Sequence, residues 1–193
     1  MITSPSKLDR PEIADVLFHP RKSEGGSPPA SAEDLHIELS GNGLRLSCRL
    51  HLSDREAPVI LHFHGNGEIV DDYDDIARDF TACGINIFFA TYRGYGNSTG
   101  SPTVSGLFND NIQISAYLRD YLAAKGYSGA LFAMGRSLGA ASAIDLVSRC
   151  PDDFKGLILD SSFADTLPLL ARLGCMVRDE SLTESDGFNN LDK

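Results

Sequence analysis

Basic residues are scarce in this sequence. It has 17 lysines and arginines against 27 aspartates and glutamates, which gives a formal net charge of −10. Nucleic acids and anionic membranes are bound through basic surfaces, so neither is expected as a partner. Long apolar runs are absent too, since none approaches the roughly 18 residues of a membrane span. The N-terminus, MITSPSKLDRPEIADV, lacks the apolar segment of a secretory signal.

Cysteine is also rare, and its positions show no pairing motif. No two of the four form a CxxC pair; they are Cys48, Cys83, Cys150 and Cys175. This usage favours buried, reduced thiols in a cytoplasmic protein. Hydrophobic residues make up 42% and charged residues 23% of the 193 positions, as expected for one globular domain with a hydrophobic core.

The composition changes near residue 33. Residues 1–33 are rich in proline, serine and charge, as in HPRKSEGGSPPASAED, which predicts an irregular, loosely held N-terminal lead-in. Within it, the short piece VLFHP is apolar enough to dock on the rest. From residue 34 the pattern becomes regular, and we expect a single domain over residues 34–193.

This regular part begins with strand patterns. LHIEL and LRLSCRLHL alternate apolar with polar residues, which is typical of half-buried strands, and the GNG between them predicts a hairpin turn. APVILHFHG is mostly apolar, as expected for a strand buried on both faces. The later segments INIFFATY, ALFAMG and GLILD are further strand candidates.

Helical patterns separate the later strands. They cover residues 69–84, 103–126 and 138–149, each ending at a glycine or before a proline, and a weaker pattern lies around residues 167–173. Strands that alternate with helices predict βαβ crossovers. We therefore expect an α/β fold, a doubly wound and mostly parallel sheet with an antiparallel hairpin at its N-terminal edge.

One serine stands at a strand-to-helix junction. In AMGRSLGAAS, Ser137 follows a predicted strand and precedes a predicted helix, with Gly135 and Gly139 two residues away on either side. A side chain at either glycine would clash across a tight, strained turn. Such a turn holds the serine at the carboxyl end of the sheet, where open α/β sheets bind ligands. The N–H of Leu138, at the helix start, is well placed to hold an oxyanion.

A second glycine-containing loop, HGNGE at residues 64–68, follows the strand VILHF. Gly65 and Gly67 let the backbone approach a ligand, and the N–H of Asn66 is our candidate for the second oxyanion donor. A plain glycine turn between a strand and a helix is the alternative. The functional interpretation is favoured because both loops end neighbouring parts of one sheet.

These motifs resemble a known superfamily. HFHGNGE, YRGYGNSTGSP and GRSLGA, in this order and at these separations, are similar to the α/β-hydrolases, and most of all to the small esterase-like branch called Bem46-like or dienelactone-hydrolase-related serine hydrolases. The resemblance covers roughly residues 33 to 193. It implies that Ser137 is the nucleophile and that Leu138 and Asn66 supply the oxyanion donors. The motifs are not specific to a substrate: ester, thioester and amide stay open, and a small-molecule carboxylic ester or thioester is favoured. No cofactor is expected, because the mechanism needs only side chains and backbone N–H groups, and the oligomeric state stays open.

The same resemblance implies two further strands, one followed by the catalytic acid and the other by the histidine. The sequence ends before both, and residues 161–193 match only the start of a cap or connection region. We therefore expect the acid and the histidine beyond residue 193, and the last strands of the fold to be missing. A serine without its base keeps only a residual acceleration of about 10³- to 10⁴-fold over water. The absent strands would also leave an apolar sheet edge and helix face uncovered, which predicts that the chain is poorly stable or prone to aggregate.

Other interpretations stay open. His62 and His64 lie on one face of a strand near the proposed oxyanion loop, so each is a candidate base, and Asp160 is a candidate partner for a base or a loop-fixing residue. The same histidines are candidate ligands of a metal-dependent hydrolase. That idea uses nearby acids which a solvated helix face also explains: Glu68, Asp71, Asp72, Asp74 and Asp75. The last alternative is a catalytically inactive fragment or binding module that keeps the fold.

Overall fold

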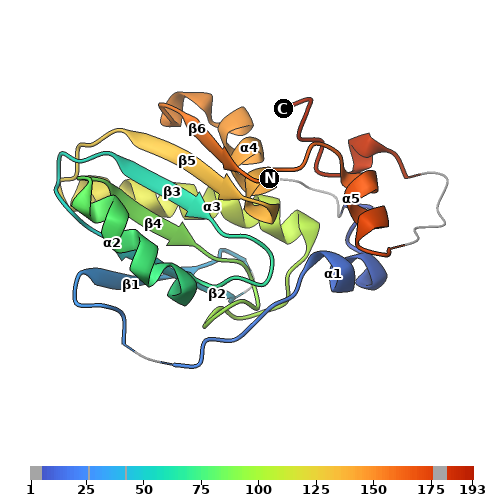
Figure 1. The fold of residues 1–193 in the computed structure, drawn as a ribbon, viewed down its shortest axis with the longest axis horizontal. Coiled ribbons are helices and arrows are strands. Elements are labelled where there is room, and N and C mark those ends of the chain that lie inside the picture. The colour runs from blue at the N-terminus through green and yellow to red at the C-terminus, as the bar shows by residue number, and fades with distance from the viewer. Residues whose placement is uncertain (1–5, 26, 42, 176–181) are drawn as a thin grey trace.

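A single mixed sheet of six strands organises the molecule, in the order β1-β2-β4-β3-β5-β6 (Figure 1). The computed structural model describes residues 6–25, 27–41, 43–175 and 182–193. The hairpin of β1 and β2 is antiparallel, β2 runs antiparallel to β4, and β4, β3, β5 and β6 run parallel. The strands are β1 (Ala32–Glu38), β2 (Arg45–His51), β3 (Val59–Phe63), β4 (Asn86–Ala90), β5 (Leu131–Arg136) and β6 (Leu157–Asp160).

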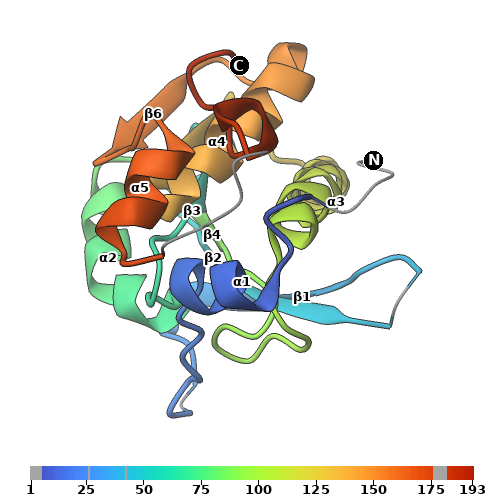
Figure 2. The same ribbon diagram turned by 90° about the vertical axis from the view of Figure 1, so that its right-hand side faces the viewer.

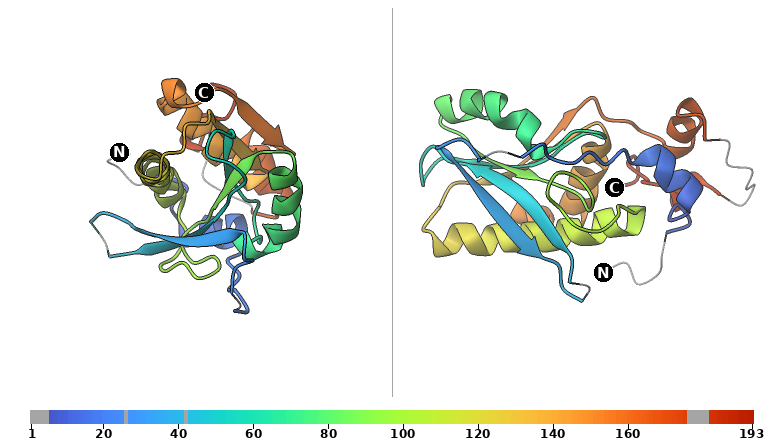
Figure 3. Two further views of the ribbon diagram at one scale, coloured as in Figure 1. Left: turned by 90° about the vertical axis from the view of Figure 1, so that its left-hand side faces the viewer. Right: turned by 90° about the horizontal axis from the view of Figure 1, so that it is seen from below.

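Helices cover both faces of this sheet. Helix α2 lies on one face, and α3 and α4 lie on the other (Figures 2 and 3). This arrangement confirms the doubly wound α/β fold with its N-terminal antiparallel hairpin. In the described part of the chain, no helix is long and apolar enough to cross a membrane. The α-helices are α1 (Pro11–Leu17), α2 (Asp74–Ala82), α3 (Val104–Ala124), α4 (Leu138–Arg149) and α5 (Thr166–Arg172), with short 3₁₀ turns η1 (Val70–Tyr73), η2 (Pro151–Asp153) and η3 (Glu184–Asp186).

The pleat of the central strands divides the core between the two faces. In β4, Phe88 faces the large core under α3 and α4, whereas Ile87 and Phe89 belong to a smaller core under α2. All five residues of β3 and of β4 are buried. Apolar residues on both faces of these strands follow from their position in the middle of a sheet that is covered on both sides.

The N-terminal segment differs from the expected loose lead-in. It contains helix α1, whose Ile13 and Leu17, four residues apart, are 0% and 2% exposed. Leu8 and Phe18 join them in the large core. The sequence correctly indicated that VLFHP docks on the body. Its proline-rich surroundings hid the helix, which starts with Pro11 at a position where a missing N–H costs nothing.

Residues 182–193 also pack against the body of the domain. The carboxylate of Glu184 accepts the N–H groups at the start of α5, at 2.7 and 2.9 Å. Phe188 is completely buried. The ammonium of Lys193 lies 2.7 Å from the carboxylate of Asp145, a buried residue of α4. These contacts anchor the segment at both its start and its end.

The edge strand β6 exposes apolar side chains, as the sequence led us to expect. It pairs with β5 on one side only within the sheet. Leu157, Ile158 and Leu159 are 38%, 41% and 44% exposed. An apolar edge strand without lysine or proline in it is a template for pairing with another chain.

We predict that Ile158→Lys reduces self-association of this chain, because a lysine on an edge strand opposes edge-to-edge pairing. The free energy of unfolding should change by less than about 1 kcal/mol, since Ile158 is already partly exposed. Size-exclusion chromatography with light scattering measures the effect. Leu191→Lys is the control, because Leu191 is exposed but lies outside the strands. A wild-type chain that is a monodisperse monomer with sharp, cooperative thermal unfolding would contradict the prediction.

Candidate active site

Ser137 forms a strained turn between β5 and α4. Its backbone has φ 50° and ψ −113°, a left-handed φ that is uncommon for a residue with a side chain. The residue is exposed, and its N–H donates to the carbonyl oxygen of Asp160 at 2.9 Å. The turn therefore presents the serine at the carboxyl end of the sheet. The N–H of Leu138 opens α4, where the first N–H groups have no acceptor within the helix.

The two glycines around Ser137 are required by close backbone contacts. A Cβ atom at Gly135 would lie 2.3 Å from the carbonyl oxygen of Gly139, so the expected clash across the turn is confirmed. A Cβ at Gly139 would lie 2.1 Å from the carbonyl oxygen of Phe63 and 2.8 Å from that of His64. The first turn of α4 therefore packs directly on the end of β3, where the loop of residues 64–68 begins.

That loop is braced by a charged bridge which the sequence did not reveal. The N–H of Gly65 donates to Oε2 of Glu68 at 2.7 Å, and the hydroxyl of Tyr73 donates to the same oxygen. Arg136, the residue before the serine, donates from Nε to Oε1 of Glu68 at 2.9 Å and from Nη1 to Oδ2 of Asp160 at 3.1 Å. The bridge thus joins the loop, the serine turn and the end of β6.

Both carboxylates of this bridge, those of Glu68 and Asp160, are stabilised in their ionised forms. Burial opposes the ionisation of Glu68, but hydrogen bonds from Tyr73, the Gly65 N–H and Arg136 hold its pKa below the ordinary value. The pKa of Asp160 is also lowered, first by the hydroxyl of Ser161 and then, against a smaller effect of burial, by Arg136. Asp160 therefore has the contacts of a loop-fixing residue, through both its carboxylate and its backbone carbonyl.

Asn66 follows β3 in the same loop, and its side chain is bound to the N-terminal segment. Its Oδ1 accepts the backbone N–H of His19 at 2.8 Å and the hydroxyl of Tyr95 at 2.7 Å. The structure thus brings the loop that carries Asn66 against the turn that carries Ser137 and Leu138. Nothing in the sequence around His19 indicated its contact with Asn66, which lies 47 positions further along the chain.

His64 has the environment of a structural histidine. It is fully buried, its Nδ1 donates to the carbonyl of Gly65 at 2.8 Å, and its Nε2 lies 3.3 Å from the hydroxyl of Thr91. Its ring packs on Tyr92 with centroids 4.5 Å apart. Burial lowers its pKa to about 4, so the ring is neutral at neutral pH. Both ring nitrogens already have partners within the fold.

His62 is buried beside it, at 2% exposure. Its ring packs between Tyr73 and Phe89, with centroid distances of 4.8 and 5.1 Å. Burial, with a smaller effect of neighbouring His64, lowers its pKa to about 3. Within the described residues, the hydroxyl of Ser137 has no hydrogen bond to any histidine.

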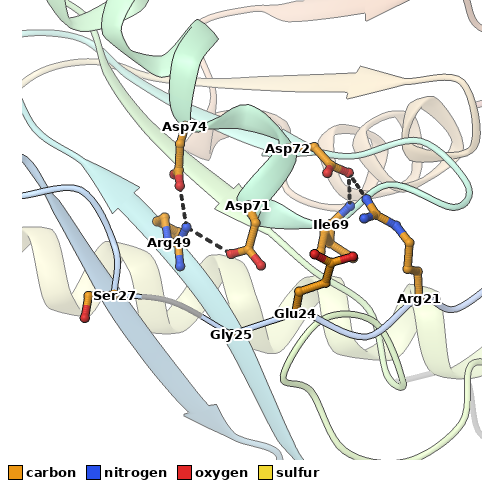
Figure 4. A pocket seen from close by; sticks show the side chains of 9 residues that line it. All are labelled: Arg21, Glu24, Gly25, Ser27, Arg49, Ile69, Asp71, Asp72 and Asp74. Carbon is orange, nitrogen blue, oxygen red and sulfur yellow. Dashed lines mark hydrogen bonds and ion pairs between the residues drawn. The ribbon is translucent and has the colours of Figure 1, made fainter.

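The acidic residues after the loop form ion pairs with arginines, and this corrects the expectation of a simply solvated helix face. Nη1 of Arg49, a buried residue of β2, lies 3.0 Å from Asp71 and 2.7 Å from Asp74. Arg21 pairs with Asp72. These residues line a polar cavity of about 270 Å³, and Figure 4 shows how their side chains lie. Across the described residues, no group of three or more histidine, cysteine or acidic side chains is arranged to hold a metal ion, so the metal-dependent alternative gains no support.

The strand order, the strained serine turn and its contact with the glycine loop define an α/β-hydrolase fold. The model of the Hydrolase_4 family, described as serine aminopeptidase, S33, matches residues 54–176, and the chain belongs to this family.

Its relatives include hydrolases of several kinds. The chain is 33% identical to protein bem46 of Schizosaccharomyces pombe over 136 residues, 68% of this chain and 45% of that protein. It is 32% identical to the lysophosphatidylserine lipase ABHD12 of Xenopus tropicalis over 115 residues, 56% of this chain and 28% of the lipase. Among solved structures, a predicted CIB-like hydrolase from Thermoplasma acidophilum is 28% identical, with a TM-score of 0.52 over 68% of this chain and 63% of that one. The chain thus spans about half or less of the curated relatives named here.

We predict that Gly139→Ala lowers the free energy of unfolding by about 2–4 kcal/mol, because its Cβ would collide with the backbone of Phe63. Urea denaturation measures the change. The matched control is Gly156→Ala, whose Cβ would meet only the ring edge of Phe132 at 3.0 Å; it should cost less than about 1 kcal/mol. Equal losses in the two variants would show that the contact with β3 is not tight.

The buried histidines predict a pH dependence of stability. The pKa values of His62 and His64 fall from the ordinary 6.5 to about 3 and about 4 on folding, so below pH 6.5 the unfolded chain binds protons that the folded chain excludes. The stability contributed by the neutral rings is complete above about pH 6.5. It is lost as the pH falls, by up to about 1.4 kcal/mol per pH unit for each histidine.

Urea denaturation at successive pH values from about 7 down to 5 measures this slope. His62→Leu removes one of the two titrating rings and still fills the space between Tyr73 and Phe89 with a side chain. The slope of this variant should be shallower than that of the wild type by up to about 1.4 kcal/mol per pH unit. Superimposable slopes would contradict the assignment of His62 as a neutral, buried ring.

Proposed function

We propose that this chain carries the nucleophile and oxyanion hole of a serine hydrolase that acts on carboxylic esters or thioesters. Ser137 is the nucleophile, and the backbone N–H groups of Leu138 and Asn66 are the oxyanion donors. The observation that carries the proposal is the strained serine turn, packed through Gly139 on the end of β3 where the loop of Asn66 begins. The family match and the named lipase relative support it.

In this mechanism Oγ of Ser137 attacks the substrate carbonyl carbon while a general base takes the hydroxyl proton. The carbonyl oxygen becomes an oxyanion and accepts hydrogen bonds from the N–H groups of Leu138 and Asn66. The tetrahedral intermediate collapses, the base returns its proton to the leaving alcohol or thiol, and an acyl-serine remains. Water, deprotonated by the same base, attacks the acyl-serine and releases the acid and the free enzyme.

The general base is the component that the described residues do not place at Ser137. His64 and His62 are buried and neutral, and His36 is bound to the hydroxyl of Ser47 at 2.9 Å. His51 lies 3.2 Å from Asp74, and His19 lies against Asn66. We propose that the catalytic histidine and its acid come from outside residues 1–193. The relatives named above are longer than the region they share with this chain.

Esters and thioesters are favoured because alcohols and thiols are better leaving groups than amines, and so depend less on protonation by the base. The family description names an aminopeptidase, and one relative is named as a lysophospholipid lipase. The competing proposal is a catalytically inactive fold that binds a small molecule. The observation in its favour is that Ser137 lacks a hydrogen-bonded base among the described residues.

Fluorophosphonate labelling, followed by intact-mass spectrometry, tests the nucleophile and the missing base together. The chain is treated with the probe with and without added imidazole, which can act as a general base in solution. We expect a single adduct that forms slowly alone and faster as the imidazole concentration rises. Ser137→Ala is the control and should form no adduct under either condition.

Each outcome separates the proposals. Rapid labelling of Ser137 without imidazole would confirm the nucleophile and place a base within this chain, contrary to the proposal. Labelling that persists in Ser137→Ala would contradict the assignment of the nucleophile. A folded chain that stays unlabelled even with imidazole would favour the inactive binding fold.

A further inference from the structure

The segment of residues 18–25, called the strap here, crosses the loop that carries Asn66. Its contacts with the body come from residues 18–23: Phe18 lies in the large core, and the hydroxyl of Ser23 donates to Asp71 at 2.5 Å. Arg21 donates from Nε to the carbonyl of Gly67 at 3.2 Å and pairs with Asp72 (Figure 4). Lys22 donates to the carbonyl of Ser98 at 3.0 Å. The strap is therefore a fixed part of the structure and offers His19 a defined position.

At His19 the strap holds the side chain of Asn66 from both ends of its amide. The backbone N–H of His19 can only donate, so the oxygen that it meets at 2.8 Å is Oδ1 of Asn66. The amide nitrogen Nδ2 then lies 2.7 Å from Nδ1 of the His19 ring. Because an amide nitrogen can only donate, Nδ1 must accept, and the ring carries its proton on Nε2.

Tyr95 completes the arrangement. Its hydroxyl donates to Oδ1 of Asn66 at 2.7 Å and accepts the N–H of His19 at 2.9 Å. The tyrosine is completely buried and lies beside His64, with ring centroids 5.3 Å apart. Its position is thus set by the core, and it fixes the Asn66 amide against that core.

The backbone around Asn66 needs such an anchor. Its neighbours on both sides are glycines, and Gly67 has a φ of +77°, so neither neighbour restricts the Asn66 peptide as other residues would. Glu68 holds the loop at Gly65. The carbonyl of Gly65, in the same peptide unit as the Asn66 N–H, accepts hydrogen bonds from Nδ1 of His64 at 2.8 Å and from the N–H of Glu68 at 3.3 Å. The side chain of Asn66 adds an anchor from the strap side.

We infer that His19 is a positioning residue for the oxyanion hole: through the Asn66 amide, the strap acts together with the His64 bond to the Gly65 carbonyl to hold the direction of the Asn66 N–H. This inference rests on the proposed function. His19 itself touches neither the substrate nor Ser137. Its effect is exerted through Nδ1, which accepts a hydrogen bond from the Asn66 amide. A shift of about 1 Å in a catalytic group is enough to slow a reaction severalfold to a hundredfold.

Two substitutions of His19 in the full chain separate positioning from simple packing. His19→Asn keeps an acceptor atom close to the place of Nδ1, whereas His19→Leu removes it at similar size. The first readout is hydrogen–deuterium exchange of the peptide that covers residues 64–68, which requires no activity. The second is the rate constant for fluorophosphonate labelling of Ser137 in the presence of imidazole. Lys22→Met is the matched control, because it loosens the strap without touching Asn66.

We expect His19→Leu to exchange faster at residues 64–68 and to label about tenfold more slowly, since removal of a whole oxyanion donor costs about 10²- to 10³-fold. His19→Asn and Lys22→Met should stay within about twofold of the wild type, the size of change that a merely loosened strap would give. If His19→Leu matches the wild type in both readouts, or if His19→Asn is impaired as much as His19→Leu, the positioning role is wrong. If no variant labels Ser137, the proposed function fails, and the exchange measurement alone decides whether His19 holds the loop.

Discussion

The structure depends on the contact between the first turn of α4 and the end of β3. At Gly139 a single added carbon would lie 2.1 Å from the carbonyl oxygen of Phe63, so the helix can come this close only because glycine has no side chain. The contact fixes where α4 starts. It thereby brings the serine turn, in which Ser137 has a left-handed φ of 50°, against the loop of residues 64–68.

Around this contact, the loop is held by two independent sets of polar groups. On one side, Glu68 connects it through Arg136 to Asp160 at the end of β6. On the other side, the Asn66 amide connects it to the strap and to Tyr95. Glycines make the loop able to approach a ligand, and the polar contacts remove the freedom that those glycines would otherwise give it. Such preorganisation is what stabilisation of an oxyanion requires.

Much of this could be predicted from local sequence. Periodicity placed the central strands and the helices of the βαβ units, and GRSLG marked the turn at Ser137. Contacts between distant segments could not be predicted in this way. Ile13 and Leu17 of α1 stand in a proline-rich stretch. Asp71 and Asp74 read as solvated because their partner, Arg49, lies more than 20 positions away in β2. The roles of Ser137, Leu138 and Asn66 stay predictions, because they concern reactivity rather than packing.

A crystal structure of this chain with a phosphonate attached to Ser137 would test the oxyanion hole most directly. We expect the phosphoryl oxygen to accept hydrogen bonds from the backbone N–H groups of both Leu138 and Asn66, with the Asn66 amide still bound to His19 and Tyr95. A phosphoryl oxygen that faces solvent, or that meets Leu138 alone while residues 64–68 lie elsewhere, would contradict this expectation.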